Sequence, residues 1–198
     1  MKKIKGPVSD NLIVKRIKTI LTENGYDKEV QTVICNLYSY IRDHNFWGSC
    51  HSISSVLYVA LKELGLNPTL CIGVCYDKKA SFFDHSWLLV DGKIIDLSIY
   101  MPLNQKINYV SGPIIFDIDM VTMKHYCFEY GVSYPYGFSF ETLFVLNTSF
   151  SKYMDDFPIT CNGLWDILRE IFPKELEMSN KELFDKYFST KRMIIEGD

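Results

Sequence analysis

Apolar residues in the first third of the chain recur at the three- and four-residue spacing of amphipathic helices. The pattern predicts a first helix that begins at Asp10 or Asn11 and ends at Asn24-Gly25, and a second helix from about Asp27 to His44. A third series follows Gly48-Ser49 and keeps the helical spacing throughout, at Ile53, Val56, Leu57, Ala60, Leu61 and Leu64. Gly65 and Asn67-Pro68 end it. We therefore expect three consecutive helices before residue 69.

The periodicity changes from helical to extended after Pro68. Three apolar runs, Thr69–Tyr76, Ser81–Val90 and Lys93–Ile99, predict strands. Asp91-Gly92 separates the last two runs and is typical of a two-residue hairpin, because a type I′ turn needs positive φ at both positions.

The second half of the chain is harder to assign. Gly112–Ile118 predicts a strand, whereas Met120–Tyr130 and Phe140–Met154 fit either a helix or a strand. Leu164–Ile171 predicts a helix that ends at Phe172-Pro173, and Ser179-Asn180-Lys181-Glu182 has the pattern of a capping box that opens a last helix. The order of elements indicates an α+β fold, which we expect to form one domain over residues 1–198.

Composition supports a globular protein without a polyanionic partner. Among 198 residues, 47% are hydrophobic and 23% charged, values at which a packed core can form. The 21 basic and 24 acidic residues give a net charge of -3, which disfavours nucleic acid and anionic membrane as partners. The Lys-rich start is followed by residues 6–11, which are too polar for a signal peptide, and we expect a cytoplasmic protein.

The six cysteines lack the spacing of a secreted disulfide framework. Cys71 and Cys75 lie in one predicted strand, where about 3.3 Å per residue separates them by roughly 13 Å, too far for a disulfide or a shared zinc ion. We expect no metal and no cofactor. A metal site made from cysteines and His85 is the weakest alternative.

Cys50 occupies the first turn of the third helix, on the apolar face that also carries Ile53 and Leu57. Unpaired N–H groups and the positive end of the helix dipole favour a thiolate there. The same N–H groups can hold an oxyanion. The alternative interpretation of Cys50 is a small buried hydrophobic residue.

The hairpin register gives the cysteine a partner. Pairing Val90 with Lys93 places His85, Trp87 and Asp96 on one face of the sheet, with His85 and Asp96 as diagonal neighbours. A carboxylate so placed can bind one imidazole nitrogen and leave the other for a thiol. We predict that Cys50 points at this face from its helix N-terminus. A buried His-Asp pair without chemistry is the competing interpretation.

Four further residues are candidates for the surroundings of this site. Asn45 and Trp47 are candidates for completing an oxyanion hole, and Trp87 for binding substrate. His51 projects about 100° around the helix from Cys50, so it is expected at the mouth of the site and not as the base.

These segments together resemble the core of the transglutaminase-like superfamily. The similarity lies in Gly48-Ser49-Cys50, in the helix end at residues 61–68, in the strand at residues 70–74, and in residues 85–96, and it covers about residues 46–100. The short spacing from Cys50 to His85 is similar to that of the compact bacterial members.

The resemblance implies a papain-like fold and a Cys50, His85 and Asp96 triad. It also implies a cysteine-dependent hydrolase or acyltransferase that acts on a peptide, a protein or a small amide or amine. A non-enzymatic peptide- or protein-binding module on the same fold is the alternative, using the aromatic residues of the second half. These are Tyr126, Phe128, Tyr130, Tyr134, Tyr136, Phe138 and Phe140.

Overall fold

The computed structural model describes residues 8–78, 81–103 and 111–197. Helices α1 (Asp10–Glu23), α2 (Lys28–Asp43) and α3 (Cys50–Glu63) precede the first strand, within one or two residues of their predicted bounds. The Asp27 side chain caps α2 by accepting a hydrogen bond from the Val30 N–H at 2.9 Å. The basic start of the chain lies outside the described residues.

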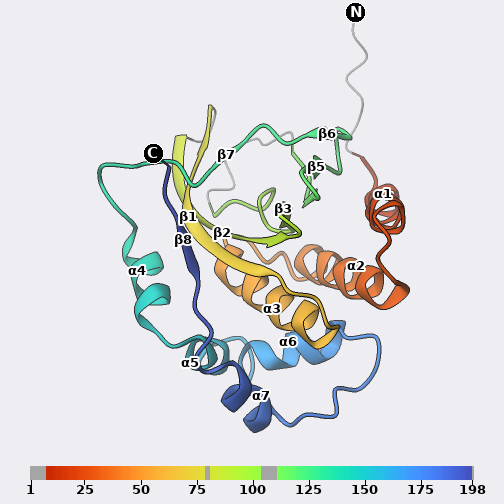
Figure 1. Ribbon diagram of the computed structural model, residues 1–198, viewed down its shortest axis with the longest axis vertical. Helices are drawn as coiled ribbons and strands as arrows, with labels where there is room; N and C mark the ends of the chain where they lie inside the picture. The colour runs from red at the N-terminus through yellow and green to blue at the C-terminus, as the bar shows by residue number, and fades with distance from the viewer. Residues whose placement is uncertain (1–7, 79–80, 104–110, 198) are drawn as a thin grey trace, which may run out of the picture.

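A curled, mostly antiparallel sheet follows the three helices. Its strands are β1 (Thr69–Asp77), β2 (Ser81–Val90), β3 (Lys93–Asp96), β4 (Ile114–Ile115), β5 (Ile118–Asp119), β6 (Lys124–His125), β7 (Glu129–Tyr130) and β8 (Met193–Ile195). The order is β6-β5-β4-β3-β2-β1-β7, and β8 pairs with β1 in parallel. Figure 1 shows α2 and α3 across one side of this sheet, with α6 beneath them. The fold is thus α+β, with N-terminal helices, a sheet and C-terminal helices.

The hairpin between β2 and β3 forms as predicted. Asp91 and Gly92 have φ values of 51° and 75°, and Val90 pairs with Lys93. The Tyr26 hydroxyl donates a hydrogen bond to the Asp91 carboxylate at 2.6 Å, which ties the turn to the α1–α2 connection. The two-residue turn therefore fixes the register of β2 and β3, and the contact with Tyr26 holds the turn in place.

The sheet buries apolar side chains on both faces. Leu88 and Ile95 belong to the larger core, which also contains the apolar stripe of α3. Trp87 and Ile94, their neighbours in sequence, belong to a smaller core with Cys71 and Cys75. Alternate residues of a strand point to opposite faces, which explains why these strands are apolar throughout.

One expectation for residues 112–118 is corrected, and the open assignment of residues 120–130 is decided. The single strand over Gly112–Ile118 is wrong, because Phe116 and Asp117 have φ values of 50° and 67° and turn the chain between β4 and β5. The Asp117 carboxylate stabilises this turn by accepting a hydrogen bond from the Ile94 N–H at 2.9 Å. Residues 120–130 form turns and the short strands β6 and β7, not a helix.

The C-terminal part is mainly helical. The ambiguous run at residues 140–154 forms α4 (Phe140–Asn147) and α5 (Phe150–Asp155), separated by an extended backbone at Thr148. Helices α6 (Leu164–Ile171) and α7 (Asn180–Tyr187) confirm the predicted ones, including the capping box of α7. The short β8 was not predicted, because its pairing with β1 joins segments far apart in sequence. Within the described ranges, no helix is long and apolar enough to cross a membrane.

Gly73 provides a test of how β8 docks on the sheet. A Cβ at this position would lie 2.5 Å from the Ile195 carbonyl oxygen and 3.1 Å from the Trp87 ring. We expect Gly73→Ala to lower the free energy of unfolding by about 1–3 kcal/mol, because backbone must move to make room. Urea unfolding monitored by tryptophan fluorescence measures this, and an unchanged midpoint would contradict the close approach of β8.

Candidate active site

Cys50 begins α3, and its position is fixed by the turn before it. Ser49 is the N-cap residue, but its hydroxyl donates a hydrogen bond to the Phe46 carbonyl and accepts none from the first-turn N–H groups of α3. The first-turn N–H groups of α3 thus lack a side-chain acceptor and remain available to an anion. The Gly48 N–H donates to the Met101 carbonyl at 2.9 Å, which holds the start of α3 beside the segment that follows β3.

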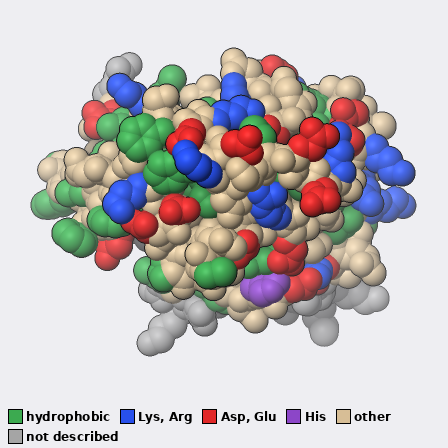
Figure 2. All heavy atoms as spheres, turned by 90° about the horizontal axis from the view of Figure 1, so that it is seen from below, with side chains coloured by type: hydrophobic (Ala, Val, Ile, Leu, Met, Phe, Trp, Pro, Cys, Tyr) green, Lys and Arg blue, Asp and Glu red, His purple; other side chains and the backbone are tan. Residues whose placement is uncertain are grey.

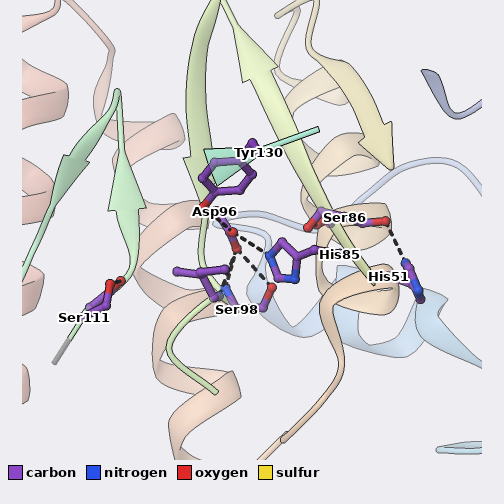
Figure 3. A network of polar contacts seen from close by, with 10 residues as sticks. His51, His85, Ser86, Asp96, Ser98, Ser111 and Tyr130 are labelled. Atoms are coloured by element: carbon purple, nitrogen blue, oxygen red, sulfur yellow. Dashed lines mark hydrogen bonds and ion pairs between the residues drawn. The ribbon is translucent and has the colours of Figure 1, made fainter. Parts of the chain in front are cut away.

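His85 and Asp96 form a buried ion pair across β2 and β3. The distance from His85 Nε2 to Asp96 Oδ2 is 2.6 Å, and the side chains are 5% and 0% exposed. Figure 3 shows the two side chains directed at each other from neighbouring strands. The hairpin register therefore brings together the two residues that the sequence places on one face.

Every oxygen of the Asp96 carboxylate has donors. Oδ1 accepts from the Ser98 N–H, the Ser98 hydroxyl and the Ile99 N–H at 3.0–3.1 Å. Oδ2 accepts from His85 and from the Tyr130 hydroxyl, the latter at 2.9 Å. Burial raises the pKa of Asp96, but His85 and these hydrogen bonds outweigh burial and hold the pKa below its usual value. The carboxylate is thus charged in the folded protein.

His85 is the cationic partner of this arrangement. Burial lowers the pKa of His85, whereas the charges of Asp96 and Cys50 and their hydrogen bonds raise it more, to about 10. Asp96 occupies Nε2, so Nδ1 is the ring nitrogen left for the Cys50 thiol. At neutral pH the imidazole ring is protonated and places a positive charge beside the Cys50 sulfur.

Cys50 reaches this pair from the N-terminus of α3 and forms a side-chain hydrogen bond with His85. The apolar stripe of α3 packs with Leu88 and Ile95, on the sheet face opposite to that of His85 and Asp96. The stripe therefore packs away from the pair, and the first turn of the helix reaches it. This turn lies beside residues 98–103 beyond β3.

An open cavity of about 820 Å³ adjoins the pair, and both Cys50 and His85 line it. His51 also lines it, with Nδ1 2.7 Å from the Ser86 hydroxyl and Nε2 3.2 Å from the Thr142 hydroxyl. Burial, then the positive charge of His85, lowers the pKa of His51 to about 4. His51 is therefore neutral, and Figure 3 shows it on the far side of β2 from Asp96.

The other predicted site residues lie elsewhere. Asn45 and Trp47 are exposed and are not among the described residues that line the cavity, so their positions give the oxyanion assignment no support. Trp87 is buried in the smaller core and packs edge-on against Tyr130, with ring centroids 5.0 Å apart. It contacts the site through Tyr130 and does not line the cavity.

Tyr130 is the site residue whose role sequence reasoning missed. Burial, then Asp96, raises the pKa of Tyr130 well above its usual value, so its hydroxyl keeps a proton to donate. Its strand β7 pairs with β1, and 34 residues separate Tyr130 from Asp96. No local pattern in the sequence indicates such a contact.

The aromatic residues of the second half lie in different places. Phe128 and Tyr130 pack in the smaller core, as does Tyr126 at its edge. Tyr134, Tyr136 and Phe138 line the cavity instead. Phe140 belongs to neither group and is exposed on α4. The aromatic set is therefore part core, part cavity surface and part open surface.

Comparison with known proteins gives one family match. Residues 24–104 match the family model of the transglutaminase-like superfamily, a wider segment than the sequence resemblance covered because it includes α2. No curated protein and no solved structure matches the chain significantly. The matched segment contains Cys50, His85 and Asp96, and it is this part of the chain that is similar to the transglutaminase-like superfamily.

Proposed function

We propose that this protein is a cysteine-dependent hydrolase or acyltransferase that acts on an amide bond through an acyl-enzyme intermediate. The observation that carries the proposal is the buried His85–Asp96 pair, joined at 2.6 Å, with Cys50 beside it on an open cavity. A His-Asp pair that served only stability would need neither a thiol nor an opening to solvent. The match of residues 24–104 to a superfamily rich in cysteine enzymes supports the same interpretation.

Each residue has its own task in the proposed reaction. The Cys50 sulfur attacks the amide carbon, and the first-turn N–H groups of α3 stabilise the oxyanion that forms. Protonated His85 gives its Nδ1 proton to the leaving nitrogen, which releases the amine and leaves a thioester. His85, now neutral, then removes a proton from water or from an acceptor amine that attacks the thioester. The carbon–sulfur bond breaks, the acid or new amide leaves, and the Cys50 thiolate and protonated His85 are restored.

Asp96 acts through His85. Its bond to Nε2 fixes the ring orientation and keeps Nδ1 directed at the thiol. Because Tyr130, Ser98 and Ile99 saturate the carboxylate, Asp96 stays charged and cannot rotate away. Ordering of the imidazole by a saturated carboxylate is the feature that the chemistry requires.

A binding module is the second candidate, and the aromatic lining of the cavity favours it. One variant distinguishes an enzyme from a binding module. Cys50→Ser removes the nucleophile and leaves the shape of the cavity, so an enzyme loses turnover and keeps ligand binding.

The first prediction concerns the reactivity of Cys50. We expect iodoacetamide near neutral pH to label Cys50 before the other five cysteines, because protonated His85 stabilises its thiolate. Peptide mapping by mass spectrometry after short exposures gives the order. Cys127 and Cys161 are internal controls, since both are exposed whereas Cys50 is only partly so.

The same labelling in His85→Ala provides the second half of this test. Loss of the positive charge should slow labelling of Cys50 by about tenfold or more and leave Cys127 and Cys161 unchanged. If the labelling rate simply followed the solvent exposure of each thiol, with Cys127 and Cys161 labelled before Cys50, the proposal would be contradicted.

A further prediction uses the pKa of His85, which is 6.5 ordinarily and about 10 in the folded protein. Because folding raises this pKa, the pair stabilises the fold fully below pH 6.5, and the contribution is lost as pH rises through about 10. We expect the free energy of unfolding to fall more steeply over this interval in the native protein than in His85→Gln. Urea titrations at several pH values measure both slopes, and equal slopes contradict a protonated His85.

Tyr130→Phe tests whether the Tyr130 hydroxyl stabilises the charged Asp96 carboxylate. Loss of a hydrogen bond to a charged carboxylate should lower the free energy of unfolding by about 1.5–3 kcal/mol near neutral pH. Because folding lowers the pKa of Asp96, this stabilisation is present above its usual pKa and is lost as pH falls through the folded value. The difference between variant and native protein should therefore shrink in acid.

Tyr126→Phe is the matched control for that variant. Tyr126 lies 5.2 Å from Tyr130 between ring centroids, but it is not among the donors to Asp96 in the described chain. If Tyr126→Phe matched Tyr130→Phe in size and pH dependence, the effect would reflect packing and not the hydrogen bond.

A further inference from the structure

The cavity beside Cys50 has an aromatic side that reaches solvent. Phe82 and Tyr134 stack with ring centroids 4.8 Å apart, and Tyr136 packs edge-on against Tyr134 at 5.3 Å. Tyr136 is 84% exposed and Leu103, also in the lining, is 82% exposed. Apolar side chains gathered at the opening of one cavity, and not scattered singly, are typical of a surface that binds an apolar partner.

The charges of the same cavity have one sign outside the His85–Asp96 pair. Asp84 and Glu141 line it, and no lysine or arginine does so among the described lining residues. Asp84 is held in place by the Ser139 N–H, which donates to its carboxylate at 2.6 Å. A carboxylate on a ligand would meet two like charges, and the cation in the lining, His85, is already paired with Asp96, which disfavours acidic ligands.

The size of the cavity indicates a peptide and not a small amine. Its volume of about 820 Å³ lies near the upper end of ordinary ligand sites, so a single small amide would leave most of it empty. One side of it continues into α4, whose residues Phe140, Leu143 and Phe144 are 79%, 45% and 56% exposed. Figure 2 shows hydrophobic side chains gathered at the left, the side on which Figure 1 draws α4, and mixed charges over the rest of that face.

We infer that this cavity selects a peptide segment with a bulky apolar or aromatic side chain and without a neighbouring carboxylate. The inference rests on the proposed function, since it takes the cavity to be where the reacting amide binds. The stacked Phe82 and Tyr134 receive the apolar side chain, and Tyr136 covers it at the opening. Asp84 and Glu141 exclude acidic residues next to it.

Binding to a Cys50→Ala variant tests this selection without any chemistry. Three fluorescein-labelled pentapeptides are compared by anisotropy, with alanine at four positions and Phe, Ala or Asp in the centre. Burying an aromatic side chain, and removing a repelled carboxylate, should make the Phe peptide bind at least about tenfold more tightly than the Asp peptide, with Ala between them. Equal dissociation constants for the three peptides overturn the inference.

Two surface variants in the same background locate the effect. Tyr136→Ala should weaken binding of the Phe peptide several-fold and leave the Ala peptide unchanged, whereas Glu141→Gln should improve binding of the Asp peptide. Phe188→Ala is the control, because Phe188 is 54% exposed and is not among the described residues that line the cavity. A loss of Phe preference in Phe188→Ala equal to that in Tyr136→Ala would overturn the assignment to the cavity.

The two proposals fail separately. Peptide preference in Cys50→Ala depends on the cavity alone, whereas iodoacetamide selectivity in the native protein depends on His85 and Cys50. If Cys50 is labelled selectively but the three peptides bind equally, the proposed function stands and the peptide selectivity is refuted. If labelling is unselective but the Phe peptide binds more tightly, the peptide selectivity stands and the proposed function is refuted.

Discussion

The buried carboxylate of Asp96 is the constraint on which the site depends. A charge without solvent would be strongly unfavourable unless the protein supplied donors, and here His85, Ser98, Ile99 and Tyr130 supply them. These donors come from β2, from the turn after β3 and from β7. The curled sheet must therefore close around Asp96 before the carboxylate is satisfied, which couples the stability of the fold to the geometry of the site.

The same constraint explains the protonation of the imidazole. Two histidines line the cavity, and burial disfavours the charged form of each. His85 has a carboxylate at 2.6 Å and stays protonated at neutral pH, whereas His51 has only the hydroxyls of Ser86 and Thr142 and is neutral. The protein thus places one cation beside Cys50, and that cation is the ring in contact with Asp96.

The larger core and the smaller core have separate tasks. The larger core packs α3 on one face of β2 and β3 and so sets where Cys50 lies. The smaller core, with Trp87 against Tyr130, sets where the Asp96 carboxylate and its donors lie. Cys50 meets His85 at the N-terminus of α3, because the chain before the helix is hydrogen-bonded to the segment after β3 through Gly48 and Met101.

Local patterns in the sequence determined α1, α2, α3, α6 and α7, the first three strands apart from the end of β3, and the pairing of His85 with Asp96. Helical spacing, capping residues and the Asp91-Gly92 turn all act over a few residues, and a two-residue turn fixes the strand register that follows it. The tertiary structure alone decided which sheet face α3 covers, the turn at Phe116-Asp117, the docking of β8, and the bond from Tyr130 to Asp96. It also decided that Asn45 and Trp47 are not among the described residues that line the cavity and that His51 is held by Ser86 and Thr142. These features depend on contacts between segments far apart in the chain, and such contacts leave no periodic pattern in either segment.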